Sequence, residues 1–267
     1  MPKNKVAATD AEVPCDAVQW GFRIEPNGTL LSRTIMLDDL QTLFATCPAE
    51  AKLDDYRSAI VDENILGKPT VATRKISFDR LRDLYAFDRG KLLFRALRDI
   101  WTFESAAQPM LALLCATARD PIFRAMTPYL LGMPTGTEVT PPMLSMEAER
   151  IYPEKFRPSS SQGLGRNAAS SWQQAGLLCG RNEKHRARPD THPTSVGYAL
   201  LLGDLCGRRG RALFETLWAR ILDAPFYMLQ EQAILASRAG WIEYRFAGDV
   251  IEVTFRHLMP DGLRSGV

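Results

Sequence analysis

Apolar residues between positions 29 and 131 recur mostly at the three- and four-residue spacing that places them on one face of a helix. One such pattern ends before Pro48, and the next, over residues 49–65, carries Leu53 and Tyr56 on a shared face. Two more helices are expected further along, in the stretches GKLLFRALRDIWTFE and QPMLALLCATARD. The second of these is apolar enough to be centrally buried. This part of the chain is therefore predicted to be helical.

A tight turn interrupts the helical pattern at Gly67 and Pro69. Thr70, which follows, is a favourable N-cap for a helix over residues 70–87 whose apolar face includes Phe78. A helix, a short glycine-containing turn and a second helix form the outline of a helix-turn-helix. The first turn of the second helix is expected to project beyond the core, as the end of a recognition helix often does.

The hydrophobic period changes to two residues after Gly240. Ile242 and Tyr244 alternate with charged residues, and the same alternation resumes beyond Gly248. Two alternating runs around a glycine-containing turn predict a β-hairpin. Because three helical patterns precede this hairpin from residue 191 onward, the sequence predicts a C-terminal winged-helix domain.

A similar transition occurs earlier, in the stretch WQQAGLLCGRNEKHRAR. As in LASRAGWIEYRF later in the chain, an Ala-Gly pair ends a helical pattern and apolar residues follow it. We interpret this repeated pattern as a second, smaller winged-helix-like module whose basic run lies at the position of the wing. A Pro- and Gly-rich stretch at 132–142 separates the module from the preceding helices, and residues 188–194 form a linker to the last domain.

Together these patterns predict a mainly α protein, with a helical N-terminal domain that contains a helix-turn-helix, followed by winged-helix-like modules and a C-terminal β-hairpin. A chain of 267 residues accommodates two or three small domains of this kind. The expected boundaries are a mobile N-terminal tail over 1–28, the helical domain over 29–135, the second module over 136–190, the C-terminal winged-helix domain over 191–259 and a tail over 260–267.

Composition narrows the cellular setting. Apolar residues make up 46% and charged residues 24% of the chain, as in ordinary globular proteins. The five cysteines are widely spaced without a CxxC pair, which favours reduced thiols over disulfides or a zinc site. No signal peptide or transmembrane stretch is recognisable, so we expect a cytoplasmic protein without membrane contact. The net charge is only +2, so any affinity for nucleic acid has to come from local basic patches.

Catalytic signatures do not appear in the sequence. The Gly-Lys pair in LGKPT lacks the upstream glycine of a phosphate-binding loop, and no metal-spaced His/Asp cluster occurs. The three histidines lie beside basic or loop residues, which disfavours a catalytic Ser-His-Asp triad or Cys-His dyad. We therefore predict no enzyme activity, no cofactor, no metal and no small-molecule substrate.

The run RNEKHRAR concentrates positive charge in the expected wing of the second module. Arg181, Lys184, Arg186 and Arg188 lie within eight residues and are opposed only by Glu183. Cations on a wing contact phosphates and release counterions, which gives sequence-independent affinity for DNA. The alternative is a solvated loop whose charges serve solubility, and the sequence leaves both interpretations open.

The predicted recognition helix carries a second group of candidates. Thr70 and Thr73 are placed to donate to phosphates near its N-terminus. Arg74 and Lys75 are placed to reach base edges, and Lys68 lies in the turn before them. For the three cations, a DNA contact and a purely solvated position are equally compatible with the sequence.

The remaining charges of that helix favour a different interpretation. Asp79 and Asp83 alternate with Arg80 and Arg82 at the spacing of helical salt bridges, which indicates a mutually neutralised, solvent-facing surface. The polar face of the C-terminal hairpin is also close to neutral. A wing that contacts protein is therefore an alternative to a wing that contacts nucleic acid.

Four stretches resemble, in order, the BrxA family of small helical proteins from BREX phage-defence operons: SRTIMLDDLQTLF, DDYRSAIVDENILGKPTVATRKISFDRLRDLY, QPMLALLCATARDPIFR and RNAASSWQQAGLL. The similarity covers roughly residues 30–180 and is most specific at the ENILGK turn and at NAASSWQQAGLL. None of these stretches is a catalytic fingerprint, so the resemblance rests on an ordered pattern.

The resemblance implies a non-enzymatic protein that binds double-stranded DNA and acts with the methyltransferase, phosphatase-like and ATPase components of its system. It places the candidates from Lys68 to Lys75 at the helix-turn-helix, and it adds Arg166, together with the run 181–188, in the second module. The N-terminal extension and the winged helix after residue 190 depart from the family pattern. A protein–protein adaptor without DNA binding and a transcriptional regulator of the operon are the alternatives, since one fold serves several functions.

Overall fold

The computed structural model describes residues 13–25, 28–248 and 250–259. It is mainly helical and has a two-stranded antiparallel hairpin near the C-terminus, which confirms the fold class predicted from the sequence. None of the described helices combines the length and the apolar composition required to cross a bilayer.

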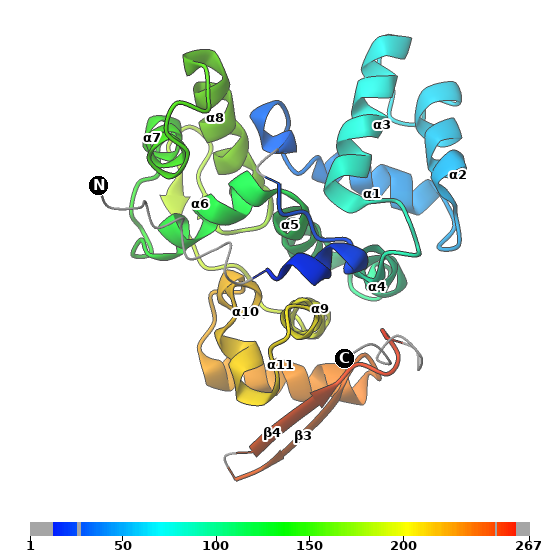
Figure 1. Cartoon of the computed structure of the whole chain (residues 1–267), viewed down its shortest axis with the longest axis vertical. Coiled ribbons are helices and arrows are strands. Elements are labelled where there is room, and N and C mark those ends of the chain that lie inside the picture. The colour runs from blue at the N-terminus through cyan, green and yellow to red at the C-terminus, as the bar shows by residue number, and fades with distance from the viewer. Residues whose placement is uncertain (1–12, 26–27, 249, 260–267) are drawn as a thin grey trace.

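The first group of helices contains the predicted helix-turn-helix (Figure 1). Its second helix begins after Thr70, whose hydroxyl accepts a 3.1 Å hydrogen bond from the backbone N–H of Thr73 and so caps the helix. Gly67 has a φ of +62° and makes the turn, a conformation that glycine adopts without strain. The elements are α1 (Leu37–Thr46), α2 (Leu53–Arg57) continued by the π-helical turn η4 (Ser58–Asp62), α3 (Val71–Tyr85) and α4 (Leu92–Ile100).

The second group has the element order of a winged helix: a helix, a short edge strand, two helices and two hairpin strands. Residues 137–139 supply the edge strand, because the Arg186 N–H donates to the Thr137 carbonyl and the Val139 N–H donates to the Lys184 carbonyl, each at 2.8 Å. The first helix of this group ends at Leu131, before the predicted boundary at residue 136, and packs against the helix that follows the edge strand. Its elements are α6 (Pro121–Leu131), α7 (Pro141–Ile151), α8 (Pro158–Gln174), β1 (Leu178–Cys179) and β2 (His185–Arg186).

The third group repeats this order at the C-terminus (Figure 1). A 3₁₀ turn, η6 (Gly210–Glu215), lies against the last strand in the place of the edge strand, since a Cβ on Gly210 would be 2.9 Å from the Ile251 carbonyl oxygen. The hairpin pairs Glu243 with Thr254 and confirms the predicted change of period. The other elements are α9 (Pro193–Leu205), α10 (Leu217–Ile221), α11 (Phe226–Arg238), β3 (Glu243–Ala247) and β4 (Val250–Thr254).

Helix α5 (Gln108–Arg119), preceded by the 3₁₀ turn η5 (Ser105–Ala107), packs against all three groups. Its apolar residues from Met110 to Ala118 are buried, as the sequence predicts for a central helix. The hydroxyl of Tyr198 on α9 donates to the Leu93 carbonyl of α4 at 3.0 Å and joins two of the groups directly. Buried side chains of the three groups form one continuous hydrophobic core, so the modules are parts of one packed body.

Residues 13–25 correct the prediction of a mobile tail over 1–28. Val13, Ala17 and Phe22 are buried, in and around the 3₁₀ turn η2 (Cys15–Trp20). These apolar residues are isolated from one another in the sequence, so no periodic pattern reveals that they pack. Residues 1–12 and the predicted tail over 260–267 lie outside the described residues.

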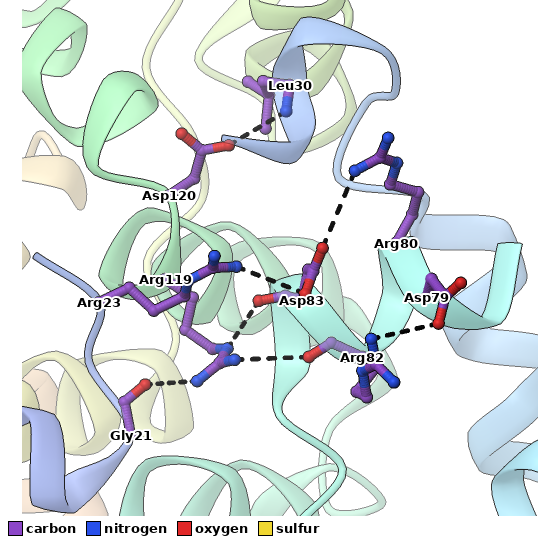
Figure 2. A network of polar contacts seen from close by, with 9 residues as sticks. All are labelled: Gly21, Arg23, Leu30, Asp79, Arg80, Arg82, Asp83, Arg119 and Asp120. Carbon is purple, nitrogen blue, oxygen red and sulfur yellow. Dashed lines mark hydrogen bonds and ion pairs between the residues drawn. The ribbon is translucent and has the colours of Figure 1, made fainter. Parts of the chain in front are cut away.

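Polar contacts hold this N-terminal segment against the helices (Figure 2). The Arg119 guanidinium donates to the carbonyls of Gly21 and Asp83, and Arg23 lies 3.5 Å from the Asp83 carboxylate. Further along, the backbone N–H of Leu30, in the 3₁₀ turn η3 (Thr29–Leu31), donates to the buried Asp120 carboxylate at 3.0 Å. The segment thus joins the helix-turn-helix to the winged-helix module behind it.

Candidate nucleic-acid interface

Helix α8 stands in the place of the recognition helix of its winged-helix module and presents one polar face. This face consists of Ser159, Gln162, Arg166 and Gln173, which recur at steps of three, four and seven residues. The helix contains no aspartate or glutamate, so the charge on this face is purely positive. Hydroxyl, amide and guanidinium groups of this kind donate hydrogen bonds to phosphates and to base edges.

Close packing against α7 keeps that face turned outward. A Cβ on Gly165 would lie 2.3 Å from the Pro141 carbonyl oxygen, so the two helices touch where only glycine fits. Leu164, Ala168 and Trp172 fill the core behind this contact. Burial of one side of α8 therefore fixes the orientation of its polar side.

The turn between β1 and β2 is tied to the C-terminal end of α8. The Gln173 side-chain N–H donates to the Gly180 carbonyl at 2.6 Å, and the Gln173 side-chain oxygen accepts a hydrogen bond from the Lys184 ammonium. Arg181 is exposed in this turn. The hairpin therefore carries two of the four predicted wing cations, Arg181 and Lys184, beside α8.

Arg186 does not belong to the interface. Its side chain is 1% exposed and lies 2.8 Å from the Asp223 carboxylate. It also donates to the carbonyls of Leu130, Leu177 and Ala187. The prediction that Arg186 contacts DNA is wrong, because its guanidinium is buried and bonded to groups inside the protein.

The fourth cation of the run, Arg188, is exposed on another side of the hairpin. Its guanidinium lies 3.9 Å from the Asp223 carboxylate, next to buried Arg186. An exposed pair at this distance contributes little stability. Arg188 is thus accessible, and its guanidinium lies beside Asp223, just after α10.

The cations of the helix-turn-helix also divide into those bonded to other residues and one that is exposed. The Lys68 ammonium lies 2.8 Å from the Asp39 carboxylate on α1. The Arg74 guanidinium donates to the carbonyls of Lys68 and Val61, each at 3.3 Å, and so braces the turn from inside. Both side chains are half-buried, and both support the turn, whereas Lys75 is exposed.

The two predicted threonines cap the helix. Their hydroxyls lie 2.8 Å apart, and the Thr70 oxygen accepts the backbone N–H of Thr73. One hydroxyl donates to the other, and Thr70 is exposed while Thr73 is half-buried. This cap fixes the start of α3 close to Lys75.

Arg80 and Arg82 are neutralised, as their spacing predicts. Arg80 lies 3.9 Å from the Asp83 carboxylate and Arg82 lies 3.1 Å from the Asp79 carboxylate (Figure 2). All four side chains are on the C-terminal half of α3. The positive charge available on this helix is therefore concentrated at its N-terminal half.

Lys75, Arg166 and Arg181 are accessible cations of these elements. Within residues 13–25, 28–248 and 250–259, none of the three side chains forms an ion pair or a hydrogen bond with another residue. A cation without an internal partner is free to make a charge-assisted hydrogen bond to a phosphate. These three residues were among the candidates from the sequence, but the sequence did not separate them from Arg186, Arg74 and Lys68.

A groove of about 400 Å³ lies where α3 meets the C-terminal end of α8. Its walls include Thr73 of α3 and Gln174 of α8, and its floor is formed by the segment that leads into α1. Arg33 on that segment and Asp38 in the first turn of α1 also line the groove. Sequence reasoning missed Arg33, because a single arginine in a short irregular segment produces no pattern.

Strongly shifted pKa values occur in the core, away from this surface. Burial raises the pKa of Cys115 to about 12 and raises the pKa of Tyr198 and Tyr85 well above the usual range. Burial likewise lowers the pKa of Arg119, which remains bonded to backbone carbonyls. These shifts follow from desolvation inside packed helices.

Comparison with known proteins gives no match for this chain among protein-family models, curated proteins or solved structures. Membership of the BrxA family therefore stays a prediction from four sequence stretches.

Proposed function

We propose that this protein is a non-enzymatic accessory protein of a BREX-type phage-defence system, related to the BrxA family, which binds duplex DNA and recruits partner enzymes. The observation that carries the proposal is the polar face of α8, which has a free arginine at its centre and no carboxylate anywhere along the helix. A recognition-position helix with this composition is suited to a polyanion. Arg181 and Lys184 extend the same positive surface onto the hairpin.

Electrostatic contact supplies the affinity in this proposal. Each phosphate neutralised by Lys75, Arg166 or Arg181 releases condensed counterions, so binding weakens as salt rises, with a log–log slope of about −0.9 per phosphate. Gln162 and Arg166 are of the side-chain types that form hydrogen bonds with base edges in the major groove. The predominant mode is docking on duplex DNA with modest sequence preference.

The C-terminal module supports the recruitment part of the proposal. Helix α11 stands in the same topological place as α8, yet it exposes Tyr227, Met228 and Leu235. Exposed aromatic and apolar side chains on one helix are typical of surfaces that bind protein. In this proposal the methyltransferase, phosphatase-like or ATPase components dock here. The same observation favours the second candidate function, an adaptor that joins protein subunits without binding DNA.

Fluorescence anisotropy of a labelled duplex of about thirty base pairs, measured across a salt series, tests the proposal. The variant K75A/R166A/R181A removes three free cations of this surface, and R245A/R256A is the control that removes two cations from the C-terminal hairpin, where both arginines are exposed and near Glu243. We expect wild type and control to share one salt slope. The triple variant loses up to about 2.7 of that slope if each cation contacts one phosphate.

Three results separate the candidates. If wild type does not bind duplex DNA at low salt, DNA binding is refuted and the adaptor function is favoured. Equal slopes for wild type and the triple variant refute the assignment of the interface to α3, α8 and the hairpin. Tight binding to the operon promoter alone favours a transcriptional regulator.

A further inference from the structure

Strand β3 has a free edge in the C-terminal hairpin, which projects from the body of the protein (Figure 1). Among the described residues β3 pairs only with β4, and η6 lies on the far side of β4. The Tyr244 N–H donates to the Ser237 hydroxyl at 3.1 Å and therefore points away from β4. Because successive residues of an antiparallel strand bond to opposite sides, the Phe246 N–H and carbonyl point to the same free edge.

The turn of the hairpin gives the same assignment. Ala247 pairs with Val250 across two residues. The pair that closes such a short turn exchanges both backbone hydrogen bonds, so the Ala247 groups point to β4 and those of Phe246 point away. Within the described part of the chain, no group bonds to the outward N–H and carbonyl of Phe246. The edge thus offers one donor and one acceptor to a further strand.

Phe246 adds an apolar side chain to this edge. It is 56% exposed, and its ring lies beside that of Tyr244, with the centroids 5.8 Å apart. Soluble proteins usually protect a free strand edge with proline, lysine, a bulge or a covering segment. The sequence of β3, EYRFA, contains neither proline nor lysine, and its register with β4 is free of bulges. Strand β3 is therefore suited to pair with another strand.

A second copy of β3 satisfies these constraints in one antiparallel register. Registers centred on Tyr244 or Arg245 require the Tyr244 N–H, which already donates to Ser237. The one centred on Arg245 also places two like charges directly opposite each other. The register centred on Phe246 uses the free N–H and carbonyl of that residue in both copies, and it sets Arg245 opposite Ala247.

The turn limits the strand to this register. Gly248, with φ of +59°, follows the last residue of β3 and leads into the turn. In the register centred on Phe246, Gly248 of the second copy lies opposite Tyr244, at the point where Ser237 occupies the edge. The incoming strand therefore ends where α11 begins to cover β3. A register shifted toward the turn, centred on Ala247, pairs Phe246 with Gly248 outside β3.

We infer that the protein forms a homodimer in which two β3 strands pair antiparallel, with Phe246 opposite Phe246, so that the two hairpins become one four-stranded sheet. Two backbone hydrogen bonds and the two phenylalanine rings join the copies. Both copies use the same patch, so the contact closes as a two-fold dimer. The contact is small, and association is expected at micromolar concentration. This surface is distinct from the polar face of α8, and the inference does not depend on DNA binding.

Sedimentation velocity at about 1–200 µM tests the inference, because weak interfaces associate in that range. The wild-type mass is expected to rise from that of one chain toward twice that value. F246P removes the outward N–H without touching the ladder with β4, since edge strands tolerate proline where the N–H faces outward. We expect it to raise the dissociation constant more than about tenfold. F246A keeps the N–H, removes the ring and is expected to raise the constant about threefold to tenfold.

V250S is the matched control. Val250 is 71% exposed on β4, so the substitution removes an exposed apolar side chain from the same hairpin and leaves the β3 edge intact. Its dissociation constant is expected to equal that of the wild type. Circular dichroism checks that every variant is folded.

Disulfide cross-linking tests the register. C15S/C179S, which removes the two exposed cysteines, is the background. Opposed residues of a hydrogen-bonded antiparallel pair have Cα atoms about 5.5 Å apart, within the range of a disulfide. Oxidation of F246C with diamide is therefore expected to give a covalent dimer. R245C is expected to stay monomeric, since the two copies of that residue are diagonal neighbours about 7–8 Å apart.

A wild-type protein that stays monomeric over the whole range refutes the inference. A dimer that F246P and F246A leave unchanged, or that V250S weakens equally, refutes it as well. Cross-linking of R245C in place of F246C overturns the register on which the inference rests. Each of these results leaves the proposed DNA binding standing, because that function is measured separately.

Discussion

Replacing Arg186 with methionine separates the structural role of the basic run from its proposed contact with DNA. The substitution keeps an unbranched side chain of similar length and removes the guanidinium. In the wild type this group is 1% exposed, pairs with Asp223 at 2.8 Å and donates to three backbone carbonyls. R186M removes one donor from each of these acceptors; the Leu130 and Leu177 carbonyls keep a backbone N–H, from Met133 and Ala187, whereas Asp223 loses its closest cation.

The expected loss of stability is large. Breaking a buried ion pair by removing one partner costs about 3–5 kcal/mol. The lower end of that range, about 3 kcal/mol, applies here because the Asp223 side chain is 24% exposed and regains some hydration. For a chain of this size each kcal/mol lowers Tm by about 2–4 °C, so a decrease of about 6–12 °C is expected.

Thermal unfolding followed by circular dichroism measures this change, with R188M and R181M as matched controls. Both controls remove an exposed arginine from the same run, and surface changes of this kind stay within about 0.5 kcal/mol. At a temperature where all variants are folded, R181M weakens DNA binding and R186M does not. An R186M protein as stable as the wild type, or one that is stable but loses salt-dependent binding, refutes this reasoning.

Three further predictions follow from local contacts. G165A forces a Cβ to within 2.3 Å of the α7 backbone, so we expect the free energy of unfolding, measured by chemical denaturation, to fall by about 1–3 kcal/mol. G67A is the control for backbone strain, because the space around Gly67 is open and steric overlap does not arise there. Unchanged stability of G165A contradicts the close helix contact. T70A removes the N-cap of α3 and is expected to lower the unfolding free energy by about 1 kcal/mol, while T70S retains it; equal losses in both argue against capping. Because burial raises the pKa of Cys115 to about 12, its thiolate is scarce at pH 8 and becomes abundant only toward pH 12. Thiol labelling of the native protein at pH 8, read by mass spectrometry, is expected to modify Cys15 and Cys179 rapidly and the other three cysteines only after unfolding; rapid labelling of Cys115 in the folded protein contradicts this.

The elements that the sequence predicts well are those whose signals are local. The cap at Thr70, the turn at Gly67 and the alternation after Gly240 each involve residues within a few positions of one another. The structure has all three. The neutral pairs of α3 are equally local, since Arg82 and Asp79 are one helical turn apart.

The contacts that the sequence does not reveal join distant residues. Arg186 and Arg181 look alike in the run RNEKHRAR, and only the partners Leu130 and Asp223 distinguish the buried residue from the exposed one. The edge strand at 137–139 is too short to show a period of two. Its pairing with β2 depends on residues almost fifty positions away.

The sequence likewise predicts only those residues of the candidate interface whose signal is local. Local charge identifies Lys75 and Arg181, but the pairing of Lys68 with Asp39 depends on how α1 packs beside the turn. Arg33 has no local signal at all. The segment that carries it is positioned by bonds from Leu30 to Asn167 and from Ile35 to Ser171, more than 130 positions away in the chain.

The contacts of Leu30 and Ile35 with α8 also constrain the order in which the protein assembles during synthesis. Leu30 is bonded to Asn167, which follows it by 137 positions in the chain. At about 5–20 residues per second, a ribosome needs roughly 7–27 s to add that length. During this interval Leu30 and Ile35, both buried in the finished protein, have no α8 to cover them. Leu30 and Ile35 therefore reach their final buried positions only after α8 has been synthesised.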